Sequence, residues 1–100
     1  MVILEMAVLP VRPGQEAAFE SAMRQARPLI AATPGFRGLT LSRGIENPSH
    51  YVLLVEWDSV EDHEVGFRGS DGYQQWRALL HHFYDPFPTV EHYAPVADLS

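Results

Sequence analysis

Three side chains that could bind an aromatic molecule and move a proton lie close together in the sequence: Trp57, His63 and Phe67. His63 and Phe67 are four residues apart, so on a helix they share one face. An imidazole with a pKa near neutrality is a suitable proton acceptor, and aromatic rings are suitable apolar walls. If that helix face looks towards Trp57, these residues would form a cleft between helices and sheet in which a phenol loses its proton.

The chemistry available to such a cleft is oxidation by dioxygen. Dioxygen is a triplet and reacts slowly with closed-shell organic molecules, whereas an electron-rich phenolate can pass it one electron and then recombine with it. A protein needs only to deprotonate the phenol, exclude water and hold the ring beside oxygen. We therefore expect His63 as the catalytic base and Trp57 and Phe67 as walls. Two other interpretations stay open: His63 as an exposed or carboxylate-bonded helix residue, and Trp57 as a residue at the core edge.

Three further residues are candidate contacts for a ligand. Glu5 interrupts an apolar strand, and a buried carboxylate needs a partner, for which the candidates are Arg37, Arg43 and His92. An ion pair at a dimer interface is favoured for Glu5 over a catalytic role. Tyr73 and Trp76 lie at helical spacing, which favours packing against the sheet over ligand binding.

The pattern of apolar and turn-forming residues predicts six elements. Proline and glycine residues separate them, and the expected stripe of the first helix comprises Phe19, Ala22, Met23, Ala26 and Ile30. Pro28 is expected to kink this helix or end its regular part. The elements are a strand over 2–9, a helix opening at Pro13 and broken at 33–35, strands over 36–45 and 50–57, a helix from Ser59 interrupted at 69–72 and resumed from Tyr73, and a strand over 88–94.

This order predicts an α+β fold of the ferredoxin-like βαββαβ type, with a four-stranded antiparallel sheet and both helices on one face. The third strand is apolar on both faces, unlike a half-buried strand, which alternates with polar residues. Because two helices cover only one face, the other needs a partner, and a second copy of the chain is the simplest one. The sequence therefore predicts a homodimer, sheet against sheet.

Composition narrows the function classes. One hundred residues correspond to a single domain over 1–100. A net charge of −6 argues against nucleic acid as a partner. The absence of cysteine excludes disulfides and a thiolate nucleophile and fits a cytoplasmic location. The first eleven residues resemble neither a signal peptide nor a membrane helix. No histidine pair has chelating spacing, and no nucleophilic triad or phosphate-binding loop is present, so no metal site is expected.

The chain resembles the antibiotic biosynthesis monooxygenase family of small dimeric α/β-barrel proteins over about its full length. The most specific part is Trp57 at a strand end, followed by residues 59–68 (SVEDHEVGFR) and then Ser70, Tyr73 and Trp76. The resemblance implies a ferredoxin-like homodimer. It also implies, as for some members, oxidation of hydroquinones or polycyclic phenols by dioxygen without a cofactor. Relatives with the same fold degrade haem.

One difference from the family concerns the first strand, where oxygenases of this group commonly carry an asparagine. The only asparagine here is Asn47, in the expected turn between the second and third strands. Either Glu5 replaces that polar group, or the usual chemistry of the family is missing. Two classes of function follow: a cofactor-independent monooxygenase acting on an aromatic, hydroquinone-like molecule, or a non-catalytic small-molecule-binding or dimerisation module.

Overall fold

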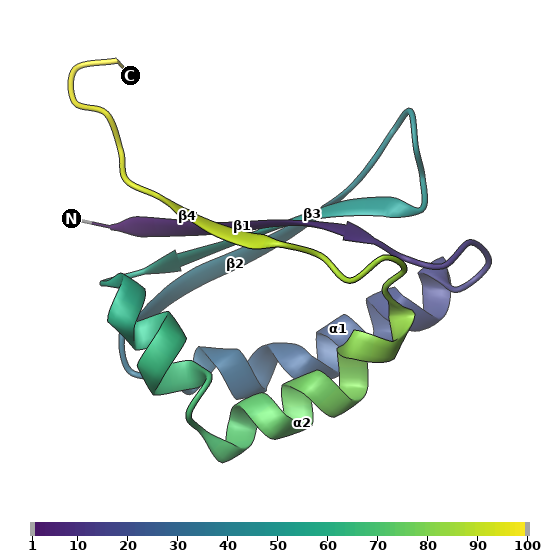
Figure 1. The fold of residues 1–100 in the computed structure, drawn as a ribbon, viewed down its shortest axis with the longest axis horizontal. Helices are drawn as coiled ribbons and strands as arrows, with labels where there is room; N and C mark the ends of the chain where they lie inside the picture. Colours follow the sequence, from purple (N-terminus) through teal and green to yellow (C-terminus); the bar gives the residue numbers. More distant parts are fainter. Residues whose placement is uncertain (1, 100) are drawn as a thin grey trace.

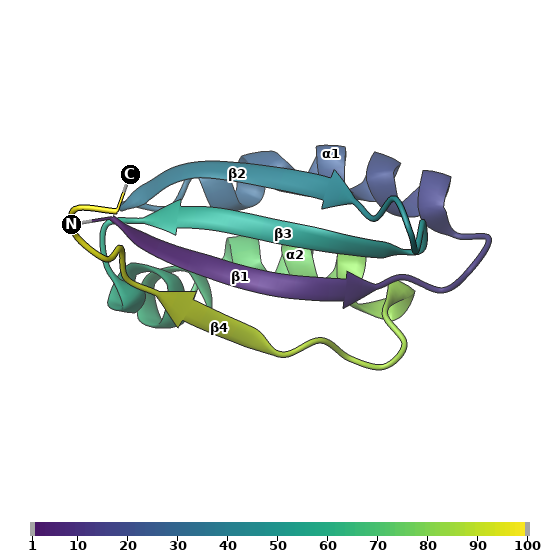
Figure 2. The same cartoon turned by 90° about the horizontal axis from the view of Figure 1, so that it is seen from above.

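The computed structural model describes residues 2–99, and it confirms the predicted order of strands and helices. The elements are β1 (Ile3–Pro10), α1 (Glu16–Ala31), β2 (Phe36–Arg43), β3 (His50–Trp57), the π-helix η1 (Asp62–Phe67), α2 (Asp71–Leu80), the 3-10 helix η2 (His81–Phe83) and β4 (Val90–Tyr93). The strands form one antiparallel sheet in the order β2-β3-β1-β4, which Figure 2 shows from above. This is the predicted ferredoxin-like α+β fold.

Both long helices lie on one face of the sheet, as predicted (Figure 1). The sheet ends at β2 on one side and at β4 on the other, so a single chain forms an open sheet and not a closed barrel. No helix within residues 2–99 is long and apolar enough to cross a bilayer.

The side chains of the middle strands alternate between a buried and an open face. Those of Tyr51, Leu53, Val55 and Trp57 point towards the helices and are buried. They meet the apolar stripe of α1, in which Phe19, Met23, Ala26 and Ile30 are buried. Two rows of apolar residues thus enclose the main core. α1 continues through Pro28 to Ala31, so this proline does not end the helix.

The predicted boundaries of the outer strands were too wide. β2 ends at Arg43 and β4 covers only Val90–Tyr93. The pairing of β2 with β3 also shifts between Phe36 and Gly38, so Arg37 is an extra residue in the strand. Because of this bulge, Phe36 faces the helices and packs edge-on against the ring of Trp57 at 5.8 Å between ring centroids.

The segment after β3 is helical from residue 60, as predicted, but its turn is wider than that of an α-helix. The side chain of Ser59 caps it by accepting a hydrogen bond from the Asp62 N–H at 3.1 Å. The Arg68 N–H then donates to the His63 carbonyl at 3.1 Å, a bond across five residues. Ser70 caps α2 in the same way, through the Tyr73 N–H.

The second face of the sheet is uncovered in the single chain. Leu4, Met6, Val52 and Leu54 on this face are half-buried, and Val8 is 44% exposed. In Figure 1, the segment after β4 and the loop between β2 and β3 both rise on this side, away from the helices. The open face is therefore apolar in the middle and flanked by two projecting segments.

Candidate functional site

The π-helix η1 brings the three residues singled out from the sequence together at the end of β3. The ring of His63 stacks on that of Trp57, with centroids 5.4 Å apart and planes at 22°. The ring of Phe67 lies 6.2 Å from Trp57. Both His63 and Phe67 are buried. The expected cluster of indole, imidazole and phenyl rings is therefore present, with His63 and Phe67 on a π-helix and Trp57 at the end of β3.

Glu5 is the polar centre of this group. It is 4% exposed, and its Oε1 accepts a hydrogen bond from the indole Nε1–H of Trp57 at 2.9 Å. The same oxygen lies 3.4 Å from Nε2 of His63, which is 3% exposed. Within residues 2–99, the hydrogen bond and the histidine contact of Glu5 involve Oε1 and not Oε2.

The preferred sequence interpretation of Glu5 is therefore wrong. A dimer-interface ion pair would need the carboxylate on the open face of the sheet, but Glu5 pairs with Val55 across the strands and faces the helices. Arg37 and Arg43, two of its proposed partners, bind Asp58 and Glu20 instead.

The third proposed partner, His92, reaches Glu5 through His63. His92 lies opposite Glu5 in the pairing of β1 with β4. Its Nε2 is 2.8 Å from Nδ1 of His63, so one of these nitrogens donates to the other. On its outer side, Nδ1 of His92 lies 4.0 Å from Oε1 of Glu64, whose side chain is half exposed. The side chains thus form a continuous row from the buried carboxylate to the surface.

Burial sets the protonation states in this row. Desolvation raises the pKa of Glu5, although the Trp57 hydrogen bond and the charge of Arg68 oppose this shift. Desolvation lowers the pKa of His63 to about 3, with further contributions from Arg68 and His92. His63 is therefore neutral near pH 7, and its contact with Glu5 is not an ion pair. This environment does not suit His63 as a base, because the protonated imidazole is disfavoured there. It suits the carboxylate of Glu5 better, because the raised pKa makes that group a stronger proton acceptor.

A small cavity of about 80 Å³ opens beside the pair, between the sheet and the second helix. Of the predicted site residues, Glu5, His63, Phe67, Tyr73 and Trp76 line it. Trp57 is fully buried and lies outside the lining. Pockets for drug-sized ligands measure about 300–1,000 Å³, so this cavity holds only a very small molecule as it stands.

Tyr73 and Trp76 combine the two roles that the sequence left open. Both pack edge-on against Phe67, at 5.4 and 5.5 Å between ring centroids. They also border the cavity. Packing in the core and contact with a ligand therefore do not exclude each other here.

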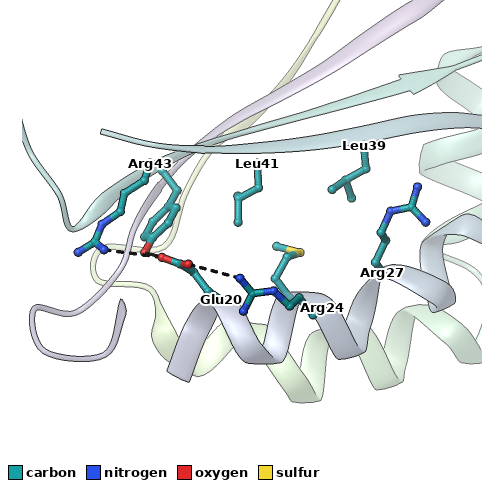
Figure 3. A pocket seen from close by; sticks show the side chains of 8 residues that line it. Glu20, Arg24, Arg27, Leu39, Leu41 and Arg43 are labelled. Atoms are coloured by element: carbon teal, nitrogen blue, oxygen red, sulfur yellow. Dashed lines mark hydrogen bonds and ion pairs between the residues drawn. The ribbon is translucent and has the colours of Figure 1, made fainter. Parts of the chain in front are cut away.

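A larger groove of about 440 Å³ lies between α1 and β2, away from these residues. Figure 3 shows its apolar floor, formed by Leu39 and Leu41, and its arginines on either side of Glu20. Glu20 lies 3.8 Å from both Arg24 and Arg43, and Tyr51 donates a hydrogen bond to it at 2.6 Å. An internal carboxylate thus already occupies the position that an anionic ligand would take.

Sequence reasoning missed two members of the site. It named His92 only as a partner of Glu5, because the register of β4 that places it beside His63 is not visible in the sequence. Arg68 lines the cavity and acts electrostatically on both Glu5 and His63. Two signals could have found Arg68: its position next to Phe67, and its place at the end of the segment 59–68.

Comparison with known proteins gives consistent results. The model of the antibiotic biosynthesis monooxygenase family matches residues 2–79. The chain is 50% identical over 95 residues to the uncharacterized protein YczJ of Bacillus subtilis (strain 168), covering 95% of this chain and 100% of that protein.

Solved structures give the same fold. A crystal structure from Bordetella bronchiseptica that carries the same family name matches with a TM-score of 0.91 and 42% identity, covering 95% of this chain and 97% of that one. SnoaB, a cofactor-independent oxygenase from Streptomyces nogalater, matches with a TM-score of 0.74 and 22% identity, covering 99% of this chain and 95% of that one.

Proposed function

This chain belongs to the antibiotic biosynthesis monooxygenase family, and we propose that it oxidises a small, electron-rich phenol or hydroquinone with dioxygen, without a metal or an organic cofactor. The observation that carries the proposal is the buried pair of Glu5 and His63, which borders a cavity lined by aromatic rings. The likeness to a cofactor-independent oxygenase supports it at the level of the fold.

In this proposal Glu5 is the base and His63 is its neighbour at 3.4 Å, the reverse of the roles expected from the sequence. The raised pKa of Glu5 brings its proton affinity closer to that of a phenol, which favours proton transfer to Oε2. The phenolate then gives one electron to dioxygen, and the two radicals combine into a peroxide. Loss of water from this peroxide leaves a quinone, so one phenol and one dioxygen give one quinone and one water.

The site must open to admit a ring. Phe87 lines the cavity next to Pro88 and is 62% exposed. Its ring contacts His81 at 4.9 Å between ring centroids. Substrate entry requires this wall to move outward, because a cavity of about 80 Å³ is below the size of ligand pockets.

Oxygen uptake by metal-stripped protein tests the proposal, with a panel of hydroquinones and polycyclic phenols corrected for autoxidation. We expect uptake above the blank that falls about 10²–10⁴-fold in Glu5→Gln, because a general base typically contributes this much. His50→Gln is the matched control, since His50 is an exposed histidine on β3. Uptake that is unchanged in Glu5→Gln would contradict the assignment of the base, and haem or flavin absorbance of the purified protein would contradict the cofactor-free reaction.

A non-catalytic small-molecule-binding or dimerisation module is the second candidate. The small cavity volume favours it. It predicts that phenols bind, or that the protein dimerises, with no oxygen uptake for any substrate. Calorimetric binding of a phenol that is never consumed would favour this candidate over the oxygenase.

We also propose that the protein is a cytoplasmic homodimer joined through the open face of the sheet. The apolar middle of that face, formed by Leu4, Met6, Val52 and Leu54, supports a second copy as its cover. A standard interface buries roughly 800 Å² on each partner, an area that one face of a four-stranded sheet can supply.

A further inference from the structure

We propose that Glu5, His63 and His92 form a proton relay that connects the cavity with the protein surface beside Glu64. This inference deepens the proposed function, on which it rests, because it assigns a path for the proton that the reaction removes from its substrate. His92 touches neither the cavity nor the reacting atoms and acts through His63.

The atoms of the row lie close enough for the protons to shift along it together. Glu5 Oε1 and His63 Nε2 are 3.4 Å apart, and His63 Nδ1 and His92 Nε2 are 2.8 Å apart. Each imidazole has one nitrogen towards its inner neighbour and the other towards its outer neighbour. His92 Nδ1 faces Glu64 Oε1 at 4.0 Å, and the His92 side chain is 16% exposed, so solvent reaches the outer end.

Two arrangements of protons fit this row. With Glu5 ionised, His63 Nε2–H points at the carboxylate, and His92 Nε2–H donates to Nδ1 of His63. With Glu5 protonated, its O–H donates to Nε2 of His63, and Nδ1–H of His63 donates to Nε2 of His92. His92 then carries its own proton on Nδ1, towards Glu64. In either arrangement each imidazole carries one proton.

The two arrangements differ by one proton. A half-turn of the Glu5 carboxyl group first brings the proton received on Oε2 opposite His63. An outward pass then moves the Glu5 proton to His63 Nε2, the His63 Nδ1 proton to His92 Nε2, and the His92 Nδ1 proton to Glu64 or solvent. It leaves both histidines in the Nε2–H form. An inward pass reverses every step and returns them to the Nδ1–H form. The phenol proton can thus leave, and another can return for the oxygen atom released as water.

A relay explains how His63 can take part in proton transfer despite its environment. Burial, with the charges of Arg68 and His92, lowers the pKa of His63 and so disfavours a cationic imidazole. Exchange of one proton for another on opposite sides of the ring avoids that cation. The charged and titratable groups around His63 are Glu5 from β1, Arg68 from the turn after η1, and His92 from β4. Glu64 from η1 lies beside His92.

The first test follows the histidine tautomers by ¹⁵N NMR on the full-length protein as pH is varied, without substrate. We expect Nε2–H on both His63 and His92 when Glu5 is ionised. As Glu5 takes up a proton, both histidines should change to Nδ1–H with one common midpoint. In Glu5→Gln this common midpoint should disappear. Tautomers that do not follow the Glu5 titration, or that change at separate midpoints, would overturn the relay.

The second test separates transfer from positioning. Glutamine in His92→Gln can still hydrogen-bond to His63 but cannot pass a proton between two nitrogens. We expect phenol-dependent oxygen uptake to fall at least tenfold in His92→Gln, to recover partly with added imidazole, and to stay unchanged in His50→Gln. Full uptake in His92→Gln would overturn the relay. If no phenol is oxidised but the tautomers change together, the relay stands and the oxygenase function fails.

Discussion

At the scale of single residues, His63 makes the stability of the fold depend on acid. Its pKa falls from an ordinary 6.5 to about 3 in the folded chain, so as pH falls below 6.5 the unfolded chain takes up this proton first. Stability is therefore present above pH 6.5 and is lost as pH falls towards 3. At about pH 4 the loss is on the order of 3 kcal/mol, at about 1.4 kcal/mol per pKa unit.

Glu5 has the opposite effect on stability, so its contribution must be measured apart from that of His63. Its pKa is raised from 4.5, so the folded chain takes up this proton first as pH falls, which stabilises the fold down to about pH 4.5. We therefore expect Glu5→Gln to lose more stability between pH 7 and pH 4 than wild type. Glu5→Gln combined with His63→Gln should lose less. Urea unfolding at pH 7 and pH 4 measures these losses of stability. Equal losses in Glu5→Gln and in the double variant would contradict the role of His63.

Which residues meet in the site could be predicted from the sequence, whereas the role of each residue could not. Glu5, His63 and Phe67 could be chosen because a carboxylate in an apolar strand, and a histidine four residues from a phenylalanine, are visible in one dimension. Protonation depends on burial, which spacing does not report. The base was therefore assigned to His63, although its surroundings make the carboxylate of Glu5 the better proton acceptor.

At the scale of elements, the approach of η1 to the start of β2 requires a glycine. Gly35 has φ +91°, and a Cβ atom there would collide with the side chain of Asp62 at the start of η1. The Gly35 carbonyl also accepts a hydrogen bond from the Asp58 N–H at 2.8 Å. The turn before β2 and the segment after β3 are thus held in direct contact.

Two glycine substitutions should therefore have opposite effects. Gly35→Ala is expected to cost about 1–3 kcal/mol, because alanine disfavours a positive φ and meets Asp62. Gly66 lies within η1, and a Cβ atom there would make only ordinary van der Waals contacts, with Thr33 Cγ2 at 3.7 Å and the Glu61 carbonyl oxygen at 3.9 Å. Gly66→Ala is expected to stabilise the chain by up to about 1 kcal/mol, as alanine favours helical backbone. Chemical denaturation of both variants measures the difference, and a stable Gly35→Ala protein would contradict this account.

The elements could be predicted where apolar periodicity determines them. β3 has the expected bounds, because its apolar run ends in turn residues on both sides. The bulge at Arg37 and the π-helical turn of η1 leave no mark in the apolar periodicity, so local pattern does not reveal them. The short β4 pairs only with β1, and its register, which places His92 in the site, follows from that pairing.

At the scale of the whole molecule, a charge placed on the open face of the sheet should prevent two chains from associating through it. Val52 lies on that face between Val8 and Ser42 in the neighbouring strands. We expect light scattering at about 10 µM to give the mass of a dimer for wild type and of a monomer for Val52→Arg, since an unpaired charge in an interface is costly.

The control for this experiment places the same charge elsewhere. Glu61→Arg changes an exposed residue near the start of the helical segment after β3, and the dimer should remain. A monomeric wild type would contradict the homodimer. A dimeric Val52→Arg protein would show that the chains meet through another surface.

The contact between Trp57 and Glu5 gives the molecule an optical reporter of its own proton. Excitation of an indole moves electron density from its pyrrole ring towards its benzene ring, so an anion beside Nε1 lowers the excited-state energy. Protonation of Glu5, which accepts from that nitrogen at 2.9 Å, removes the anion and shifts the emission of Trp57 to shorter wavelength. The colour of the fluorescence therefore registers whether the carboxylate is charged, in real time and without any label.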